Sequence, residues 1–136
     1  MSAVLNPYIS FRDNAREAMT FYQEVFGGDL DMNTFGDYGD KDAPEANLIM
    51  HANLSAPDGL AIMGADTPPG MDYTPPGGIT ISLSGDDDKL RTWFDKLAEG
   101  GDVTMPLEKQ MWGDEFGMVT DRFGTPWMVN VSAPQA

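Results

Sequence analysis

The sequence has no cysteine among its 136 residues and only one histidine. The lack of cysteine excludes a disulfide framework, a thiol nucleophile and a zinc site built on thiolates, and it is compatible with a reducing compartment. The scarcity of histidine leaves His51 as the only imidazole that can bind a metal or exchange protons near neutral pH.

Basic residues are scarce. Eight lysines and arginines stand against 22 aspartates and glutamates, and the formal net charge is −14. Because phosphate backbones and anionic membrane surfaces repel such a chain, we expect no nucleic-acid partner and no membrane partner. A cationic small molecule would be attracted. A solvated, solubilising surface explains the same acidity, and both interpretations stay open.

Long apolar runs are also missing, since none approaches the roughly 20 residues of a membrane-spanning helix. The first residues reach Asn6-Pro7 before any apolar segment develops, so the sequence shows no secretory signal. We therefore expect a cytoplasmic protein. Its length favours a single domain over residues 1–136.

Two stretches of the chain share one helical pattern. Residues 13–28 (DNAREAMTFYQEVFGG) and 86–101 (DDDKLRTWFDKLAEGG) begin with acidic residues and end with paired glycines. In the first stretch Asn14 and Glu17 have the spacing of a capping box, and apolar residues recur at helical intervals. We predict a helix in each stretch, stopped by the glycines; the second helix covers about residues 87–99.

Alternating apolar and polar residues predict one strand before each helix and three after it. The last three include the stretch WGDEFGMVTDRFGTPWMVNV, which turns at DRFG as a β-hairpin does. The chain therefore consists of two βαβββ modules. The predicted strands are residues 4–11, 29–35, 47–54 and 60–65 in the first module, and 78–84, 102–110, 115–121 and 125–132 in the second. Residues 36–44 show no periodicity and are predicted to form a mobile loop.

Residues 66–77 (DTPPGMDYTPPG) separate the modules and contain two Pro-Pro-Gly triplets. Such a segment cannot form a helix or a central strand, so we interpret it as a stiff linker between module one, about residues 1–65, and module two, about residues 78–136. A recognition motif for a partner that binds polyproline is the alternative.

The paired modules, with FRDNAREAMTFYQEVFGG near the start and WGDEFGMVTDRFGTPWMVNV near the end, resemble the vicinal oxygen chelate superfamily. This superfamily includes glyoxalases, bleomycin-resistance proteins and extradiol dioxygenases, and within it the chain is most similar to the PhnB-like proteins. The resemblance implies an α+β fold in which two βαβββ modules form a curled-sheet cup, with helices outside and the ligand inside. It also implies a homodimer.

Metal-dependent members of this superfamily carry His, Glu or Gln at four positions that face the cup. By the resemblance, these positions correspond to Asn6, Met63, Thr80 and Met128. Catalytic zinc or non-haem iron needs about three His or carboxylate donors, which this set does not supply. We therefore predict no metal. We also predict no other cofactor, because phosphate-binding glycine loops are absent.

Seven residues are candidates for lining a ligand pocket, because aromatic rings beside a carboxylate suit a cationic or aromatic ligand and methionines give an adaptable lining. Ordinary core packing is the alternative for the aromatic residues and the methionines. The candidates are Tyr8, Phe35, His51, Met63, Trp112, Glu115 and Met128.

His51 shares strand parity with Ile49 and Asn53, opposite to Met50, and this parity allows it to face the cup. It is either a hydrogen-bonded structural residue or a general base. Two functional hypotheses follow. In the first, the protein is a metal-free dimer that binds and sequesters a small molecule. In the second, it is a lyase, isomerase or dioxygenase of the same superfamily that uses His51 as a base or an unusual metal set with Glu115.

Overall fold

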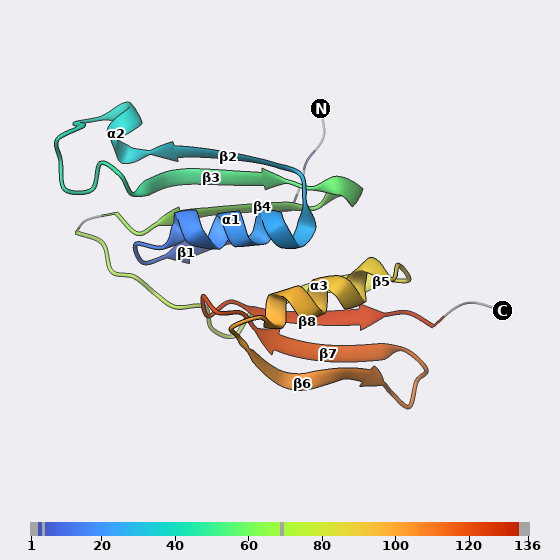
Figure 1. The fold of residues 1–136 in the computed structure, drawn as a ribbon. Helices are drawn as coiled ribbons and strands as arrows, with labels where there is room; N and C mark the ends of the chain where they lie inside the picture. Colours follow the sequence, from blue (N-terminus) through green and yellow to red (C-terminus); the bar gives the residue numbers. More distant parts are fainter. Residues whose placement is uncertain (1–2, 4, 69, 134–136) are drawn as a thin grey trace. The chain divides into compact units, whose positions relative to one another are not determined.

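The computed structural model describes residues 3, 5–68 and 70–133 (Figure 1). The remaining positions, which include Val4 at the start of the predicted first strand and Pro69 in the linker, lie outside the described residues. The chain forms two compact units, one up to Pro75 and one from Pro76. The division falls inside the predicted linker.

Module one contains one long helix and a four-stranded mixed sheet with the order β1-β4-β3-β2. β1 is parallel to β4, whereas β4 with β3 and β3 with β2 are antiparallel pairs. The elements are β1 (Tyr8–Phe11), α1 (Ala15–Phe26), β2 (Asp29–Thr34), the short helix α2 (Phe35–Tyr38), β3 (Ile49–Ser55), the 3-10 turn η1 (Pro57–Gly59) and β4 (Ala61–Asp66).

Module two repeats this plan with the strand order β5-β8-β7-β6, and again only the first pair is parallel. Its elements are β5 (Ile81–Gly85), α3 (Lys89–Ala98), β6 (Asp102–Lys109), β7 (Glu115–Thr120) and β8 (Pro126–Val131). The predicted α+β class and the two βαβββ modules are therefore confirmed, and no described helix is both long and apolar enough to pass through a lipid bilayer.

The two parallel pairs have matching registers. Tyr8 lies opposite Met63 in module one, and Ser82 lies opposite Met128 in module two. Because the registers match, each residue of β4 in module one is equivalent to one residue of β8 in module two, as Met63 is to Met128. The correspondence agrees with the sequence, where Met63 lies four residues after Gly59 and Met128 lies four residues after Gly124.

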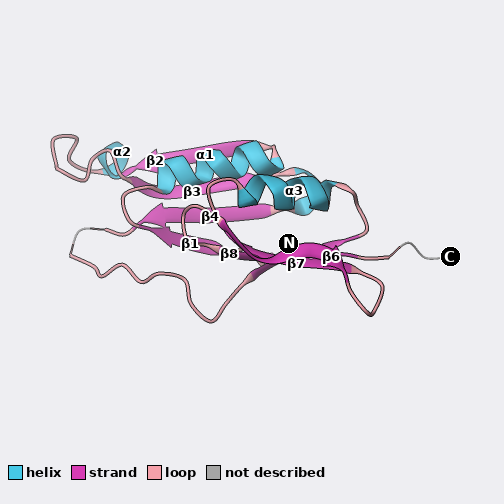
Figure 2. Cartoon of the chain, turned by 60° about the horizontal axis from the view of Figure 1, so that its bottom comes forward, coloured by secondary structure: helices cyan, strands magenta, loops and turns pink. Residues whose placement is uncertain are grey.

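In each module the long helix packs against one face of its own sheet (Figure 2). The helix contributes an apolar stripe, and alternate strand residues meet it because strand side chains point to opposite faces in turn. The buried residues of α1 are Ala15, Ala18, Met19, Phe21, Tyr22, Val25 and Phe26; those of α3 are Leu90, Phe94 and Leu97. The opposite face of the module-one sheet carries polar and half-exposed side chains, among them Tyr8, Ser10 and His51.

The start of α1 differs from the prediction. Asn14 makes no side-chain hydrogen bond to the helix, so the predicted capping box with Glu17 is wrong. Instead, Oδ1 of Asp66 accepts the Ala15 amide at 2.9 Å, and Oδ2 accepts the Ile49 amide at 2.8 Å. The sequence predicts Asp66 as the first linker residue, but it ends β4 and is only 4% exposed. The buried helix end is thus capped by a residue distant in sequence.

The predicted loop after β2 begins with a helical turn, because two reciprocal hydrogen bonds cap the N-terminus of α2. The Thr34 hydroxyl accepts the Asp37 amide at 3.2 Å, and the Asp37 carboxylate accepts the Thr34 amide at 2.9 Å. These reciprocal bonds form a capping box. They stabilise a turn too short to show any hydrophobic periodicity.

Candidate functional site

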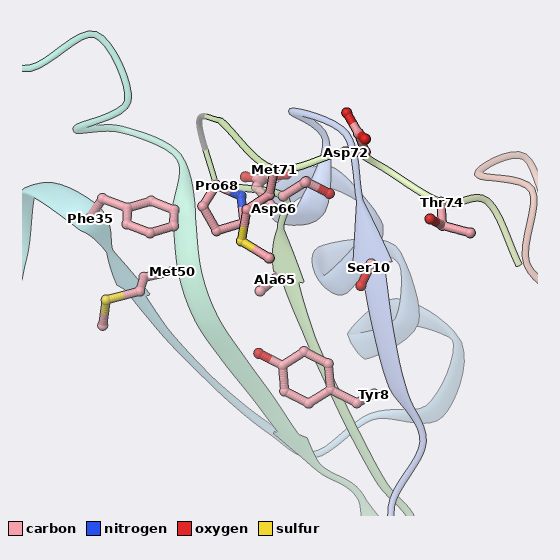
Figure 3. Close-up of a pocket in the computed structure, with 11 residues that line it drawn as sticks. Tyr8, Ser10, Phe35, Met50, Ala65, Asp66, Pro68, Met71, Asp72 and Thr74 are labelled. Carbon is pink, nitrogen blue, oxygen red and sulfur yellow. The ribbon is translucent and has the colours of Figure 1, made fainter.

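A pocket of about 340 Å³ lies in module one, at the end of the sheet where β1 and β4 finish (Figure 3). The volume is within the range of small-molecule sites. The rings of Phe35 and Tyr8 point toward it from different elements, and Met71 reaches it from the segment that follows β4. The lining residues are Tyr8, Ser10, Phe35, Met50, Ala65, Asp66, Thr67, Pro68, Met71, Asp72 and Thr74.

Met50 reaches this pocket because of an irregularity in β3. Asn33 pairs with His51 but the next residue of β2, Thr34, pairs with Ile49, so Met50 is an extra residue in β3. Ile49 is fully buried, and Met50 lines the pocket. The predicted parity, which groups Ile49 with His51 and places Met50 opposite, is therefore wrong at the bulge.

Tyr8 and His51 form a pair beside the pocket. The Tyr8 hydroxyl lies 3.4 Å from Nδ1 of His51, and the two rings stack with centroids 5.9 Å apart. Tyr8 is 54% exposed and His51 is half-buried, so the pair is accessible to a ligand. A hydroxyl and an imidazole in this arrangement can bind a polar group or relay a proton.

The polar groups around the pocket are held by the backbone. Besides Asp66, whose carboxylate accepts two amides, Thr67 donates its hydroxyl to the Phe11 carbonyl at 2.9 Å. The Thr67 amide donates to the same carbonyl at 2.8 Å. These bonds fix the residue at which β4 leads into the segment that borders the pocket.

The three module-two candidates belong to the second unit. Met128 lies between Ser82 and Met118 in the register of β5, β8 and β7. Trp112 is 62% exposed in the connection between β6 and β7, where its ring meets Phe116 edge-on at 6.4 Å. Both therefore present apolar surface within this module.

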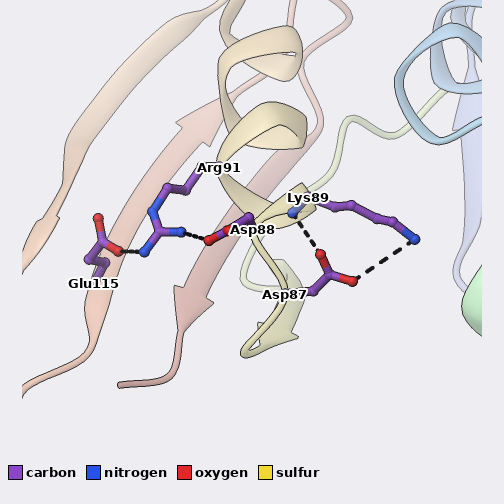
Figure 4. Close-up of polar contacts among 5 residues, drawn as sticks. All are labelled: Asp87, Asp88, Lys89, Arg91 and Glu115. Atoms are coloured by element: carbon purple, nitrogen blue, oxygen red, sulfur yellow. Dashed lines mark hydrogen bonds and ion pairs between the residues drawn. The ribbon is translucent and has the colours of Figure 1, made fainter. Parts of the chain in front are cut away.

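Glu115 lies on the helix-covered side of its sheet. It pairs across the strands with the buried Val131, and its carboxylate binds the guanidinium of Arg91 from α3 (Figure 4). This hydrogen bond holds the pKa of Glu115 below its usual range and raises the pKa of Arg91. Arg91 also binds Asp88. The Glu115 carboxylate is thus already occupied by a partner of its own module.

The structure brings together part of the predicted set. Tyr8 and Phe35 line the pocket, His51 adjoins it through Tyr8, and Met63 is the register neighbour of Tyr8 without lining the pocket. Sequence reasoning missed Met50, which the bulge turns, and Met71, which belongs to the Pro-Gly-rich linker. No periodic signal exists in that linker. The parity of Ser10 with Tyr8, by contrast, is visible in the sequence.

The residues that the resemblance assigns to the metal positions of other members are poor ligands for a divalent ion. Met63 and Met128 carry thioethers, and the buried amide oxygen of Asn6 has no hydrogen-bond partner among the described residues. None of these side chains, nor the hydroxyl of Thr80, is an imidazole or carboxylate donor of the kind that catalytic zinc or iron needs. Within the described ranges, moreover, no three His, Asp or Glu side chains cluster in a way that could hold a metal ion.

Proteins of known sequence or structure share this architecture. Protein PA1353 from Pseudomonas aeruginosa has a solved structure that is 41% identical and superposes with a TM-score of 0.86, over 98% of this chain and 100% of that one. Protein YjdN from Escherichia coli strain K12 is 32% identical over 143 residues, covering 96% of this chain and 97% of the relative.

A PhnB protein from Bacillus cereus shares the fold at 23% identity, with a TM-score of 0.73 over 96% of this chain and 100% of the other. The family model for the Glyoxalase/Bleomycin resistance protein/Dioxygenase superfamily matches residues 4–129. The predicted resemblance is confirmed: the chain belongs to the Glyoxalase/Bleomycin resistance protein/Dioxygenase superfamily.

Proposed function

We propose that this PhnB-like protein binds a small aromatic or cationic molecule in the module-one pocket, as a cytoplasmic homodimer without a bound metal ion. The observation that carries the proposal is the lining of the pocket. Two aromatic rings, Tyr8 and Phe35, and two methionines, Met50 and Met71, surround a volume of about 340 Å³. Flat rings and flexible thioethers form a surface that adapts to an aromatic ligand.

The charge of the protein supports the cationic part of the proposal. The net charge of −14 attracts cations, and Asp72 lies on the segment that borders the pocket. An aromatic face also attracts a cation through its quadrupole. A ligand with a ring and a positive group would use both features at once.

The metal-free part rests on the chemistry of the donors. Thioethers of Met63 and Met128 stand where metal-dependent members carry His, Glu or Gln. We expect elemental analysis of untagged protein purified without chelator to find far less than one divalent ion per chain, and divalent ions to leave the melting temperature unchanged. One tightly held ion per chain would contradict this part of the proposal.

The binding proposal is tested by a thermal-shift screen of aromatic and cationic compounds, followed by calorimetric titration of the hits. Phe35→Ala should weaken the hits about tenfold, since it removes one ring from the lining. Tyr38→Ala is the matched control, because Tyr38 lies in the same short helix, is 69% exposed and does not line the pocket. Equal effects of the two variants would contradict the assignment. Light scattering at micromolar concentration tests the dimer separately.

A second candidate is an enzyme of the same superfamily, and the Tyr8–His51 pair is the observation that favours it. The hydroxyl at 3.4 Å from Nδ1 gives the imidazole a partner for proton transfer. Lyase, isomerase and dioxygenase assays should then show turnover that His51→Ala abolishes while the circular dichroism spectrum is kept. Turnover that persists in His51→Ala would exclude His51 as the base.

A further inference from the structure

A second cavity, of about 420 Å³, adjoins the pocket and shares three of its lining residues. The shared residues are Thr67, Met71 and Asp72. The second cavity adds Arg12, Asp13 and Tyr73. The first pocket is mostly apolar in its side chains, whereas the second is lined by charges and hydroxyls. The two cavities therefore offer one continuous site with an apolar part and a polar part.

The topology of module one explains why these residues meet. β1 and β4 are parallel neighbours, so their carboxyl ends lie at the same edge of the sheet. Arg12 and Asp13 follow β1 directly, while Thr67 to Tyr73 follow β4. The amide and hydroxyl of Thr67 both donate to the Phe11 carbonyl and hold the two exits together. Open sheets commonly bind ligands beyond the carboxyl ends of their strands.

The charged side chains of the second cavity are exposed, and none of them has a protein partner within the part of the chain that the structure describes. Arg12, Asp13 and Asp72 make no ion pair and no side-chain hydrogen bond there. Arg91 differs, because it binds both Asp88 and Glu115. Arg16 also has no carboxylate partner among the described residues, but it donates to the Asn47 carbonyl and lines neither cavity. Arg12 is therefore available to an anionic group of a ligand.

We propose that the two cavities hold one ligand, a zwitterion with an aromatic body. Its carboxylate binds the guanidinium of Arg12, its ammonium group binds Asp72 and Asp13, and its ring lies between Tyr8 and Phe35. This inference rests on the proposed function and specifies the class of ligand. Arginine is suited to the anionic end, because its planar fork donates two parallel hydrogen bonds to a carboxylate.

The second cavity contains side chains of both charges, and this favours a zwitterionic ligand over one with a single charge. A ligand with only negative charge meets Arg12 but is repelled by the two carboxylates. A ligand with only positive charge leaves Arg12 unpaired. Only a ligand with both charges satisfies all three side chains, and the separation of the polar and apolar cavities places its ring apart from its charges.

Four probes that share a phenyl ring test the inference by calorimetric titration. L-phenylalanine carries both charges, phenylpropionate only the negative one, phenethylamine only the positive one, and phenethyl alcohol neither. We expect L-phenylalanine to bind about tenfold more tightly than either singly charged probe. Compared with phenylpropionate it adds a charge-assisted contact to the carboxylates, and compared with phenethylamine it adds one to Arg12.

Two variants assign the charges to their residues. Arg12→Gln should weaken L-phenylalanine and phenylpropionate about tenfold and leave phenethylamine unchanged. Asp72→Asn should weaken L-phenylalanine and phenethylamine and leave phenylpropionate unchanged. Arg16→Gln and Asp86→Asn are the matched controls, because both residues are exposed and line neither cavity. The controls should change no affinity.

Two outcomes separate this inference from the proposed function. If phenethyl alcohol binds and Phe35→Ala weakens it, while the charged groups and Arg12→Gln make no difference, the zwitterion inference is overturned and the aromatic pocket stands. If L-phenylalanine binds with the expected dependence on Arg12 and Asp72 but Phe35→Ala has no effect, the polar site stands and the aromatic pocket is overturned. An L-phenylalanine affinity no higher than that of the singly charged probes also overturns the inference.

Discussion

The two modules have the same strand order, and the registers of β1–β4 and β3–β4 match those of β5–β8 and β7–β8, but their buried carboxylates lie in different places. In module one Asp66 ends β4 and binds the amides of Ala15 and Ile49. The register pairs Asp66 with Phe11 and Val131 with Gly85, so the corresponding position of module two is the apolar Val131. The repeat therefore preserves the backbone plan without preserving its polar anchor.

Module two has its buried carboxylate in the β-hairpin turn instead. Asp121 accepts the amides of Phe123 and Thr125 and the indole N–H of Trp127 at 2.8 Å. Ala56 occupies the corresponding place in module one, since its amide donates to the carbonyl four residues ahead, as the Asp121 amide does. Each module thus satisfies buried donors with one carboxylate, but the donors belong to different elements.

The difference has a consequence for the site. In module one the anchor joins β4, β3 and α1 at the sheet end where the pocket lies. In module two the anchor stabilises a hairpin at the other end of the strand. The buried carboxylate of module one therefore borders the pocket, whereas that of module two lies in a hairpin turn.

The largest expected effect comes from giving module one the residue of module two. Asp66→Val leaves the amides of Ala15 and Ile49 buried without acceptors, and each unsatisfied donor costs about 1–3 kcal/mol. We expect the free energy of unfolding to fall by about 4 kcal/mol in urea denaturation. The reciprocal Val131→Asp should also destabilise the protein, because it buries a carboxylate where no free backbone amides are placed to donate to it. A loss below about 1 kcal/mol in Asp66→Val would show that the anchor is dispensable.

A smaller effect tests the paired glycines that end both long helices. A Cβ on Gly28 would lie 2.2 Å from the Ser55 carbonyl oxygen, and one on Gly101 would lie 2.3 Å from that of Thr120. Gly28 also has a φ of +96°, whereas Gly27, at φ +78°, has open space around its Cβ position. Alanine at Gly101 therefore tests the clash alone, and alanine at Gly27 tests the backbone conformation alone.

The expected order of destabilisation follows from the steric clash of the added Cβ and from the cost of a positive φ. Gly28→Ala should cost about 3 kcal/mol, Gly101→Ala about 2 kcal/mol and Gly27→Ala about 1 kcal/mol, measured by urea denaturation. Equal losses at the three sites would mean that the close approach of the helix end to the neighbouring strand does not control stability.

The smallest effect concerns one surface carboxylate in each module. Hydrogen bonds from the Ala133 amide and from Asn130 lower the pKa of Asp114, and bonds from the amide and hydroxyl of Thr34 lower the pKa of Asp37. A lowered folded-state pKa adds stability above the unfolded value of about 3.9, and this contribution is lost as pH falls through the folded-state pKa.

Asp114→Asn and Asp37→Asn should therefore lower the melting temperature by about 2 °C at pH 7 and by less at about pH 2, where the carboxylates become protonated. Scanning calorimetry at both pH values makes the measurement. Asp95→Asn, on the exposed side of α3, is the control. A deficit that grows on acidification would contradict the sign of the pKa shifts.

The sequence alone determined the elements and their order. Both long helices and all eight strands could be predicted within a few residues, because period-3.6 and period-2 patterns are local and the glycine pairs mark the helix ends. The repeat was visible in the shared pattern of residues 13–28 and 86–101, and the matching registers of the parallel pairs agree with it. Tyr8 and Phe35 were likewise predicted as pocket candidates, and both line the pocket in module one.

Only the tertiary structure decided which side chains meet. The cap of α1 comes from Asp66 and not from the adjacent Asn14. The free amides at a helix start need an acceptor, and the tertiary fold places the Asp66 carboxylate beside them. A single extra residue in β3 lets Met50 line the pocket, and Arg91 of α3 binds the carboxylate of Glu115. Local patterns carry no information on contacts between residues far apart in sequence, and those contacts build the site.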